Sequence, residues 1–463
     1  MTLRGHVVIC ALMCVLIYVH MRALATDEEL RSVGYTDSQL RLLRLPPEVR
    51  QQEALAAALA KRRPPPPTTA EVALGEEERE EGSGVEGPAV RRGRMLAIGG
   101  SVTYRSSLMT CEGQTTVTCA DVEALPCAAS SRAEGARVDE PGITEGGSFW
   151  EQVCPMTVAR DGCAAAVCGE RVYVTGGMDE RDMDLDAVES CGGDGVWRRE
   201  PFTTPLPVSF HASVSVGGRL YVLGGLGVER IMDQQCWRSS VYSLDLSAGG
   251  AGAGANGGGW VSHAPMLSKR AFLGAVAVRG RVYAVGGMSV EGAEPDYTKG
   301  IPGLMWDVGH GVVNTVESWD PREGVWRKEP SLRAVANYSS PRRQIIVRRG
   351  LQGAPGARAA FGLTAVQDCL FAIGGCDGEV VLDTVESWDV RGTSEWRLEP
   401  PLKVARANLG ACSVGERVYA VGGWDTARDL PVVESFSLGA RAWREETELS
   451  IPRSNLALAV LCP

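Results

Sequence analysis

Five arginines recur at one position of a repeated pattern, which makes them the first candidates for a binding site. They are Arg160, Arg270, Arg358, Arg406 and Arg453, and Val208 takes the equivalent place in one further repeat. A guanidinium group presents a rigid fork of donors that matches a carboxylate. Five such groups around one opening would form a local positive site on an acidic protein. The alternative, left equally open, is that each arginine pairs with an acid or a carbonyl group of a neighbouring repeat.

Residues suited to catalysis or metal binding are scarce. The histidines of the repeated region are His211, His263 and His310, and they occupy unrelated positions of the repeat. No nucleophile elbow, phosphate-binding loop or cluster of metal ligands is visible. The sequence therefore predicts no catalytic residue, no cofactor, no metal and no enzymatic activity.

The 14 cysteines include no Cys-x-x-Cys pair, so a zinc module is not expected. Cys111, Cys119, Cys127 and Cys154 fall in one repeat and could pair under oxidising conditions. Others, such as Cys163, lie on or near apolar strands, where small buried thiols pack well. Reduced, structural cysteines are the favoured interpretation.

Charge and the N-terminal segment limit the partners. A net charge of −10 over 463 residues argues against nucleic-acid binding by the molecule as a whole. Residues 1–25 contain an apolar run, 7–19, which is short for a membrane span but suits a signal peptide. A signal anchor or a misassigned start codon are the alternatives. We therefore expect the secretory pathway or else the cytoplasm, with membrane contact only through such an anchor.

Residues 26–92 are expected to form a separate linker. A capping-box pattern at 36–39 opens a short leucine-rich helix, and Pro47 can begin a second helix. Four prolines at 64–67 and an acidic run at 76–81 follow, a composition too polar to bury a core. A solvated tether is the favoured role, and a docking helix for a partner is the alternative.

Six copies of a short apolar strand, each ending in two glycines, organise the rest of the chain. Arg-Val-Tyr-Ala-Val-Gly-Gly at 281–287 returns unchanged at 417–423, and looser copies end at Gly100, Gly177, Gly225 and Gly375. A Val-Glu-Ser strand follows in the clearest units, and a tryptophan marks a fourth strand. Four short strands joined by turns predict an antiparallel sheet. Such sheets pack around an axis as the blades of a propeller.

These units resemble kelch repeats in the double glycine, the tyrosine ahead of it and the tryptophan after a spacer. The resemblance covers residues 93–463 and implies an all-β, six-bladed kelch β-propeller, expected to be a monomer. It also implies a protein–protein interaction scaffold, with arginines at the position described above meeting acidic peptides. Other roles implied by the family are substrate recognition for ubiquitin ligases, which would need a BTB domain not visible in residues 1–92, actin-associated scaffolding, and enzymes acting on sugars or other small molecules.

The two ends of the repeated region are expected to complete one blade together. Inner arginines precede the second glycine of their repeat by a constant interval, as in 160–177 and 406–423. Residues 453–463 have the character of an inner strand, and residues 94–100 that of a second strand. Their pairing would close the ring and remove exposed sheet edges.

One face of the propeller is the expected binding surface. The repeat pattern places on it most long insertions and the beginnings of the inner strands, and loops on a rigid scaffold usually carry binding residues. Tyr297 and Trp306 in one insertion are candidate partner-binding residues, with packing of their own loop as the alternative. Asn337 begins a glycosylation sequon that matters only if the chain is secreted.

Overall fold

Short β-strands make up the part of the chain that the computed structural model describes, and no helix occurs among these residues. The described residues are 93–105, 114–127, 149–229, 234–247, 259–289, 311–333, 356–378, 380–392 and 394–461. They all belong to the second of two units into which the chain divides, Met1–Gly87 and Pro88–Pro463. In these ranges no helix is present that could cross a membrane. The predicted segments 1–25 and 26–92, together with Tyr297, Trp306 and Asn337, lie outside them.

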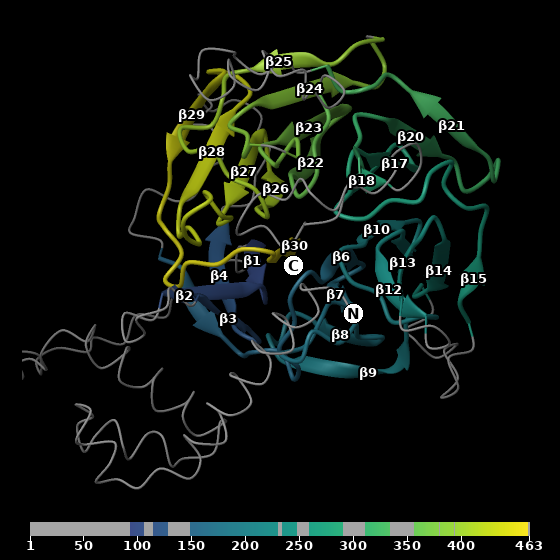
Figure 1. Ribbon diagram of the computed structural model, residues 1–463, viewed down its shortest axis with the longest axis horizontal. Helices are drawn as coiled ribbons and strands as arrows, with labels where there is room; N and C mark the ends of the chain where they lie inside the picture. Colours follow the sequence, from purple (N-terminus) through teal and green to yellow (C-terminus); the bar gives the residue numbers. More distant parts are fainter. Residues whose placement is uncertain are drawn as a thin grey trace, which may run out of the picture. The chain divides into compact units, whose positions relative to one another are not determined.

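Six four-stranded antiparallel sheets surround a central axis as the blades of a propeller, as predicted (Figure 1). We number the blades in chain order and give their strands from the axis outward. The innermost strands of blades one to six are β30 (Ala457–Leu461), β6 (Ala164–Cys168), β10 (Ala212–Val216), β16 (Gly274–Val278), β22 (Gly362–Val366) and β26 (Gly410–Val414). The second strands are β1 (Gly93–Ile98), β7 (Arg171–Thr175), β11 (Arg219–Leu223), β17 (Arg281–Val285), β23 (Cys369–Ile373) and β27 (Arg417–Val421).

The outer half of each blade is built from the Val-Glu-Ser segment, or its equivalent in blades one and three, and the tryptophan segment. The third strands are β4 (Val122–Cys127), β8 (Ala187–Cys191), β14 (Val241–Asp245), β20 (Val316–Trp319), β24 (Val385–Asp389) and β28 (Val433–Ser437). The outermost strands are β5 (Glu151–Val153), β9 (Trp197–Thr203), β15 (Val261–Ser262), β21 (Trp326–Glu329), β25 (Arg397–Glu399) and β29 (Ala442–Glu445).

Blade one is closed by the C-terminal strand. β30 pairs antiparallel with β1, in a register that runs from Arg94 opposite Leu461 to Ile98 opposite Ala457. The sheet order β30-β1-β4-β5 therefore joins the two ends of the repeated region. This confirms the predicted closure, in which β30 covers the inner edge of β1.

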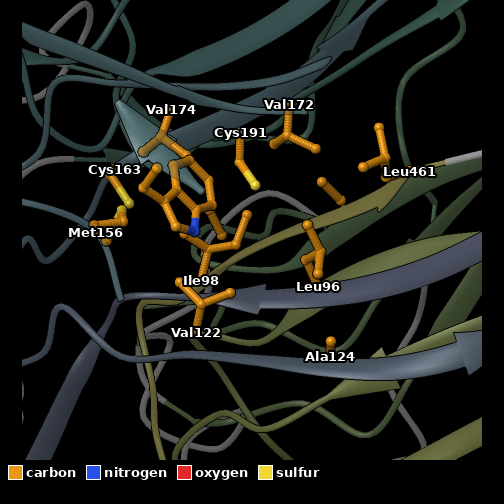
Figure 2. Packing of buried hydrophobic residues seen from close by; sticks show 13 residues of the cluster. Leu96, Ile98, Val122, Ala124, Met156, Cys163, Val172, Val174, Cys191 and Leu461 are labelled. Carbon is orange, nitrogen blue, oxygen red and sulfur yellow. The ribbon is translucent and has the colours of Figure 1, made fainter. Parts of the chain in front are cut away.

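The apolar core lies between neighbouring blades. Along β1, Met95 and Ala97 pack toward blade six, whereas Leu96 and Ile98 pack toward blade two, because successive side chains of a strand point to opposite faces. Figure 2 shows Leu96 and Ile98 facing Val172 and Val174 of blade two. Each described blade contributes to two such clusters, so each blade is stabilised by both neighbours.

Three insertions between second and third strands start and end as two-stranded ribbons rather than as plain loops. The ribbons are β2 (Ser101–Arg105) with β3 (Gln114–Thr118), β12 (Leu226–Glu229) with β13 (Gln234–Trp237), and β18 (Met288–Ser289) with β19 (Gly311–Val312). The two ends of such an insertion leave adjacent strands side by side, so their backbone groups can continue to pair.

The double glycines form the joints between blades. The second glycine of each pair donates its N–H to a carbonyl of the next blade, at 2.8–3.0 Å: Gly100 to Arg160, Gly177 to Val208, Gly225 to Arg270, Gly287 to Arg358, Gly375 to Arg406 and Gly423 to Arg453. A Cβ atom on the first glycine would lie within 2.8 Å of the same carbonyl oxygen, for example 2.6 Å for Gly374. Both glycines also have positive φ, so this close approach requires residues without a side chain.

Candidate functional site at the axial mouth

The five arginines of the predicted ring do not begin the inner strands. Each stands four residues earlier, as Arg160 does before β6 and Arg406 before β26. Two residues after each arginine the backbone is left-handed, for example at Asn408 with a φ of 55°. This turn interrupts strand pairing, because an extended strand requires negative φ.

All five guanidinium groups are fully buried, with side-chain exposures of 0%. Each one pairs with the glutamate of the third strand in its own blade. The pairs are Arg160–Glu189 at 2.5 Å, Arg358–Glu386 at 2.5 Å, Arg406–Glu434 at 2.8 Å, Arg453–Glu123 at 2.7 Å, and Arg270–Glu317. The accessible positive ring is therefore absent, and the pairing alternative describes the structure, with an acid of the same blade in place of a neighbour's.

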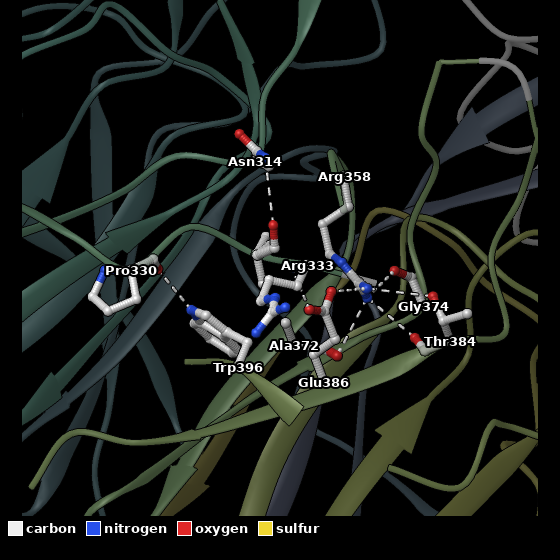
Figure 3. Close-up of polar contacts among 10 residues, drawn as sticks. Asn314, Pro330, Arg333, Arg358, Ala372, Gly374, Thr384, Glu386 and Trp396 are labelled. Atoms are coloured by element: carbon white, nitrogen blue, oxygen red, sulfur yellow. Dashed lines mark hydrogen bonds and ion pairs between the residues drawn. The ribbon is translucent and has the colours of Figure 1, made fainter. Parts of the chain in front are cut away.

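Backbone groups around each pair bind several of its remaining polar atoms. Arg358 donates through Nη1 to the carbonyl oxygens of Gly374 and Thr384, both at 3.1 Å (Figure 3). The second oxygen of Glu386 accepts the backbone N–H of Arg333 at 2.7 Å. Burial lowers the pKa of Arg406 to about 10, which still leaves it charged at neutral pH. A buried ion pair is costly to separate, because the partner that remains would be an uncompensated buried charge.

The serine of Val-Glu-Ser joins the second strand to the outermost strand. Arg281, the first residue of β17, donates to Ser318 Oγ at 3.3 Å, and Ser318 donates to Glu329 at 2.5 Å. Arg417, Ser435 and Glu446 repeat this chain in blade six. The Val-Glu-Ser motif thus links the third strand to the second and outermost strands and to the segment that precedes the innermost strand.

Blade three lacks every part of the buried pair at once. Val208 stands in place of the arginine, and Tyr242 in place of the glutamate. Pro205, which has no N–H, stands where Thr157 of blade two donates to Glu189. A small pocket lined by Val208, Tyr242 and Pro205 remains at this place. The three replacements leave neither an isolated charge nor an unused donor, which explains how blade three retains the fold.

Six left-handed residues form a ring, which we call the axial mouth. They are Gly162, Phe210, Phe272, Ala360, Asn408 and Asn455, with φ between 49° and 59°. Each of the last five donates its N–H to the carbonyl of the preceding member, at 2.7–3.1 Å. Because these residues directly precede the innermost strands, they surround the axis on the face where the double glycines end.

Phe210 and Phe272 give the axial mouth an aromatic character. Their rings stack with centroids 4.0 Å apart, and both residues are partly exposed. A bulky residue with positive φ is a conformational outlier. Sequence reasoning missed this ring, although the phenylalanines and asparagines at a fixed distance after the arginines were a visible signal.

The ring of hydrogen bonds is interrupted between blades two and one. Among the described residues no bond from Gly162 to the carbonyl of Asn455 completes it. Asp161 lies at this place, is only 6% exposed, and has one carboxyl oxygen, Oδ1, without a hydrogen-bond partner. Burial raises the pKa of Asp161 from its ordinary 3.8 to about 7. Asn455 Nδ2 contacts the other oxygen at 3.4 Å, a long hydrogen bond.

The described histidines have structural surroundings. His211 is buried, and its Nε2 lies 2.8 Å from Thr175 Oγ1. Burial lowers the pKa of His211 to about 3, so the imidazole is neutral at physiological pH. His263 shares a hydrogen bond with Ser243 at 2.8 Å. No group of three or more metal-ligating side chains that could hold an ion occurs within the described ranges.

Eight cysteines in the described ranges form no disulfide bond. Burial raises the pKa of Cys119 and of Cys163 to about 12. Because thiol reactivity requires the thiolate, these two side chains act as small apolar residues, and Cys163 belongs to the core between blades one and two.

A family model described as Kelch motif matches residues 357–403 and 405–450, which are blades five and six. The chain contains kelch repeats. Kelch repeat and BTB domain-containing protein 12 of Danio rerio is 27% identical over 177 residues, 37% of this chain and 26% of that protein. Kelch-like protein 33 of Homo sapiens is 35% identical over 79 residues, 17% of this chain and 14% of that protein.

A further kelch relative is Beta-scruin of Limulus polyphemus, 25% identical over 234 residues, 49% of this chain and 20% of that protein. The kelch propeller thus matches between 14% and 26% of the length of these three relatives. A solved structure titled "Structure of YjhT" aligns with a TM-score of 0.48 and 16% identity, over 65% of this chain and 88% of the other. Kelch-repeat proteins are in general protein-interaction scaffolds, and kelch relatives bind protein partners.

Proposed function

We propose that this kelch propeller is a non-enzymatic scaffold that binds a protein partner on the face of the axial mouth. The observation that carries the proposal is the stacked pair Phe210 and Phe272, held partly exposed at the axis in a left-handed backbone. Gly162 occupies the equivalent place in blade two, so the fold does not need an aromatic residue there. Aromatic side chains are enriched among the residues that dominate binding energy in interfaces.

Other apolar side chains on the same face support this choice. Met183 lies in the connection between the second and third strands of blade two, and Leu206 and Leu267 lie in the connections that enter blades three and four. All three are exposed. Together with the phenylalanines they place apolar area on the side of blades two to four, and a partner could bury this area.

An acidic peptide bound by the five arginines is the weaker version of this proposal. Each guanidinium already holds a glutamate in a dry environment. An incoming carboxylate would have to displace that glutamate and leave it buried without a partner, which is costly. We therefore assign the arginines to the scaffold and the partner contacts to the residues that follow them.

The proposal is tested with the full-length protein as bait. Partners are captured and identified, and the dissociation constant of each purified partner is measured for wild type and for F210A/F272A. F149A is the matched control, because Phe149 is 70% exposed on the opposite face. We expect at least tenfold weaker binding by F210A/F272A and unchanged binding by F149A. Equal affinities for all three proteins would refute the proposal.

The other roles suggested by the family resemblance are alternatives without a specific observation in their favour. Substrate recognition for a ubiquitin ligase and actin-associated scaffolding are both compatible with a binding face, and the captured partner distinguishes them. An enzyme acting on a sugar would bind its substrate at the axis, and thermal shifts with sugars would reveal it. We take the closed ring to act as a monomer, which light scattering checks.

A further inference from the structure

We propose that the axial mouth receives a basic side chain, lysine or arginine, of the protein partner, and that Asp161 is the carboxylate that binds it. This inference rests on the proposed function and specifies the chemistry of the bound segment. The arginines in the sequence suggested an acidic ligand, whereas this proposal assigns the positive charge to the partner. The structural basis is the place where the ring of the axial mouth is interrupted.

Asp161 differs from its counterparts in the other blades. The residue after the arginine position is serine or alanine elsewhere: Ser209, Ala271, Ala359, Ala407 and Ser454. In blade three the side chain of this residue reaches back to the previous blade, where Ser209 donates to Asp184 at 2.6 Å. Asp161 likewise reaches toward Asn455 of blade one. A carboxylate is therefore placed in a position that the fold fills with small neutral groups.

No cation among the described residues balances this carboxylate. The groups that lower the pKa of Asp161 are the N–H of Gly162 and the side chains of Ser101 and Asn455, all neutral. The charged group among the main causes of its shift is a second buried carboxylate, Asp429 of blade six, which raises the pKa. Arg160, its neighbour in the chain, is bound to Glu189. A positive group from outside would relieve both the desolvation and the repulsion.

The Asn455 side chain, which contacts Asp161, is held by long hydrogen bonds. Asn455 Nδ2 lies 3.4 Å from Asp161 Oδ2 and 3.4 Å from Ser101 Oγ, both at the long limit of hydrogen bonding. The same contact between blades one and two also leaves the indole N–H of Trp197 without a partner, whereas Trp396 donates to Pro330 of the previous blade at 2.8 Å. Fewer polar links thus hold these two blades together, and movement of the Asn455 amide would open the site.

Aromatic surface lies beside the carboxylate. A Cβ atom on Gly162 would be 2.6 Å from the ring of Phe210, so that ring covers the residue next to Asp161. The stem of a lysine or the plane of an arginine can pack on such a ring while its charge meets the carboxylate.

The short described loops on this face add acidic groups around the mouth. Asp179, Glu180 and Asp182 of blade two accompany one arginine, Arg181, and Asp425 of blade six accompanies Arg428. In these two loops the carboxylates outnumber the arginines, which favours the approach of a basic segment.

The test uses the full-length protein and a phage-displayed library of random 12-residue peptides. Peptides are selected on wild type, counter-selected on F210A/F272A, and then synthesised for calorimetry. We expect the selected peptides to share a lysine or arginine. D161N and D161S, the latter matching Ser209, should weaken binding at least tenfold, whereas D184N, which alters a carboxylate on the same face, should change it less than twofold. Affinity should increase from pH 6 to pH 8 for wild type and stay flat for D161N.

The outcomes separate this inference from the proposed function. Selected peptides without a basic residue, or peptides that bind D161N and D161S as tightly as wild type, overturn the role of Asp161 and leave the binding face in place. Peptides whose affinity depends neither on Asp161 nor on Phe210 and Phe272 overturn both. So does a selection that enriches no peptide on wild type over F210A/F272A. A cooperative melt of each variant shows that it is folded.

Discussion

Arg453 and Glu123 form a fully buried ion pair at 2.7 Å, although they lie at opposite ends of the propeller sequence. The pair fastens the C-terminal segment to the third strand of blade one, and β30 adds its backbone pairing with β1. Gly423 of blade six also donates to the carbonyl of Arg453 at 2.9 Å. One residue therefore connects the closing strand, blade one and blade six.

Removal of residues 453–463 is expected to destabilise the whole ring. The deletion exposes the edge of β1, removes the arginine partner of the buried Glu123 and removes the apolar contacts of Leu456 and Leu461. Circular dichroism should show a lower melting temperature, and unfolding should no longer occur in a single cooperative transition. Unchanged melting of the truncated protein would contradict the closure.

Replacing both members of the buried pair in blade six should destabilise the protein less than replacing the arginine alone. R406V leaves Glu434 as an isolated buried charge, and we expect a loss of about 3–5 kcal/mol in the free energy of unfolding. R406V/E434Y reproduces the combination of Val208 and Tyr242 and should lose less than R406V alone. Urea unfolding of both single variants and the double variant gives the coupling. Additive losses would show that the two residues do not act as a pair.

The second glycine of a pair should be far more sensitive to substitution than other glycines with positive φ. In G375A the new Cβ would lie 2.7 Å from the carbonyl oxygen of Ala359. Gly324 has a φ of 70° but open space around it, so G324A carries only the backbone strain, about 1 kcal/mol. We expect G375A to lower the free energy of unfolding by a clearly larger amount. Similar losses for the two variants would contradict the claim that close packing at the double glycine requires a residue without a side chain.

Asp161 should make stability fall with rising pH. Its pKa is about 7 in the folded protein and 3.8 ordinarily, so between pH 4 and pH 7 the folded state holds a proton that the unfolded chain has released. The free energy of unfolding therefore decreases as pH rises through this window. His211, with its pKa lowered to about 3, acts in the opposite direction below pH 6.5.

The two contributions are separated by comparing wild type with D161N in urea unfolding at several pH values. The stability of D161N relative to wild type should increase from pH 4 to pH 7 and stay constant above. His211 is common to both proteins, so its contribution cancels. A difference that does not change with pH would show that Asp161 titrates normally.

The fold could be predicted from the sequence because its determinants are local and repeated. The Gly-Gly ends, the constant interval from Arg406 to Gly423 and the tryptophans mark each strand, and the same interval predicted the closure. The burial of the arginine side chains could not be predicted this way, because each glutamate partner lies on the third strand, far along the chain. One signal was available: the repeat with Val208 in place of arginine is also the repeat with Tyr242 in place of glutamate.

No sequence pattern indicated that the axial mouth differs between blades one and two. Asp161 is one acid among many in the sequence, and its burial follows from the meeting of blades one and two. Only the structure brings it against Asn455, a residue of the closing segment. Repeats predict what the blades share, whereas function depends on how single blades differ.

Photo-crosslinking tests the central claim most directly. p-Benzoylphenylalanine is incorporated in place of Phe210, Phe272 or Phe149 in the full-length protein, and each variant is irradiated with the captured partner. The account predicts a covalent adduct from positions 210 and 272, at the axial mouth, and none from position 149 on the opposite face. An adduct from position 149 without one from 210 or 272 would contradict it.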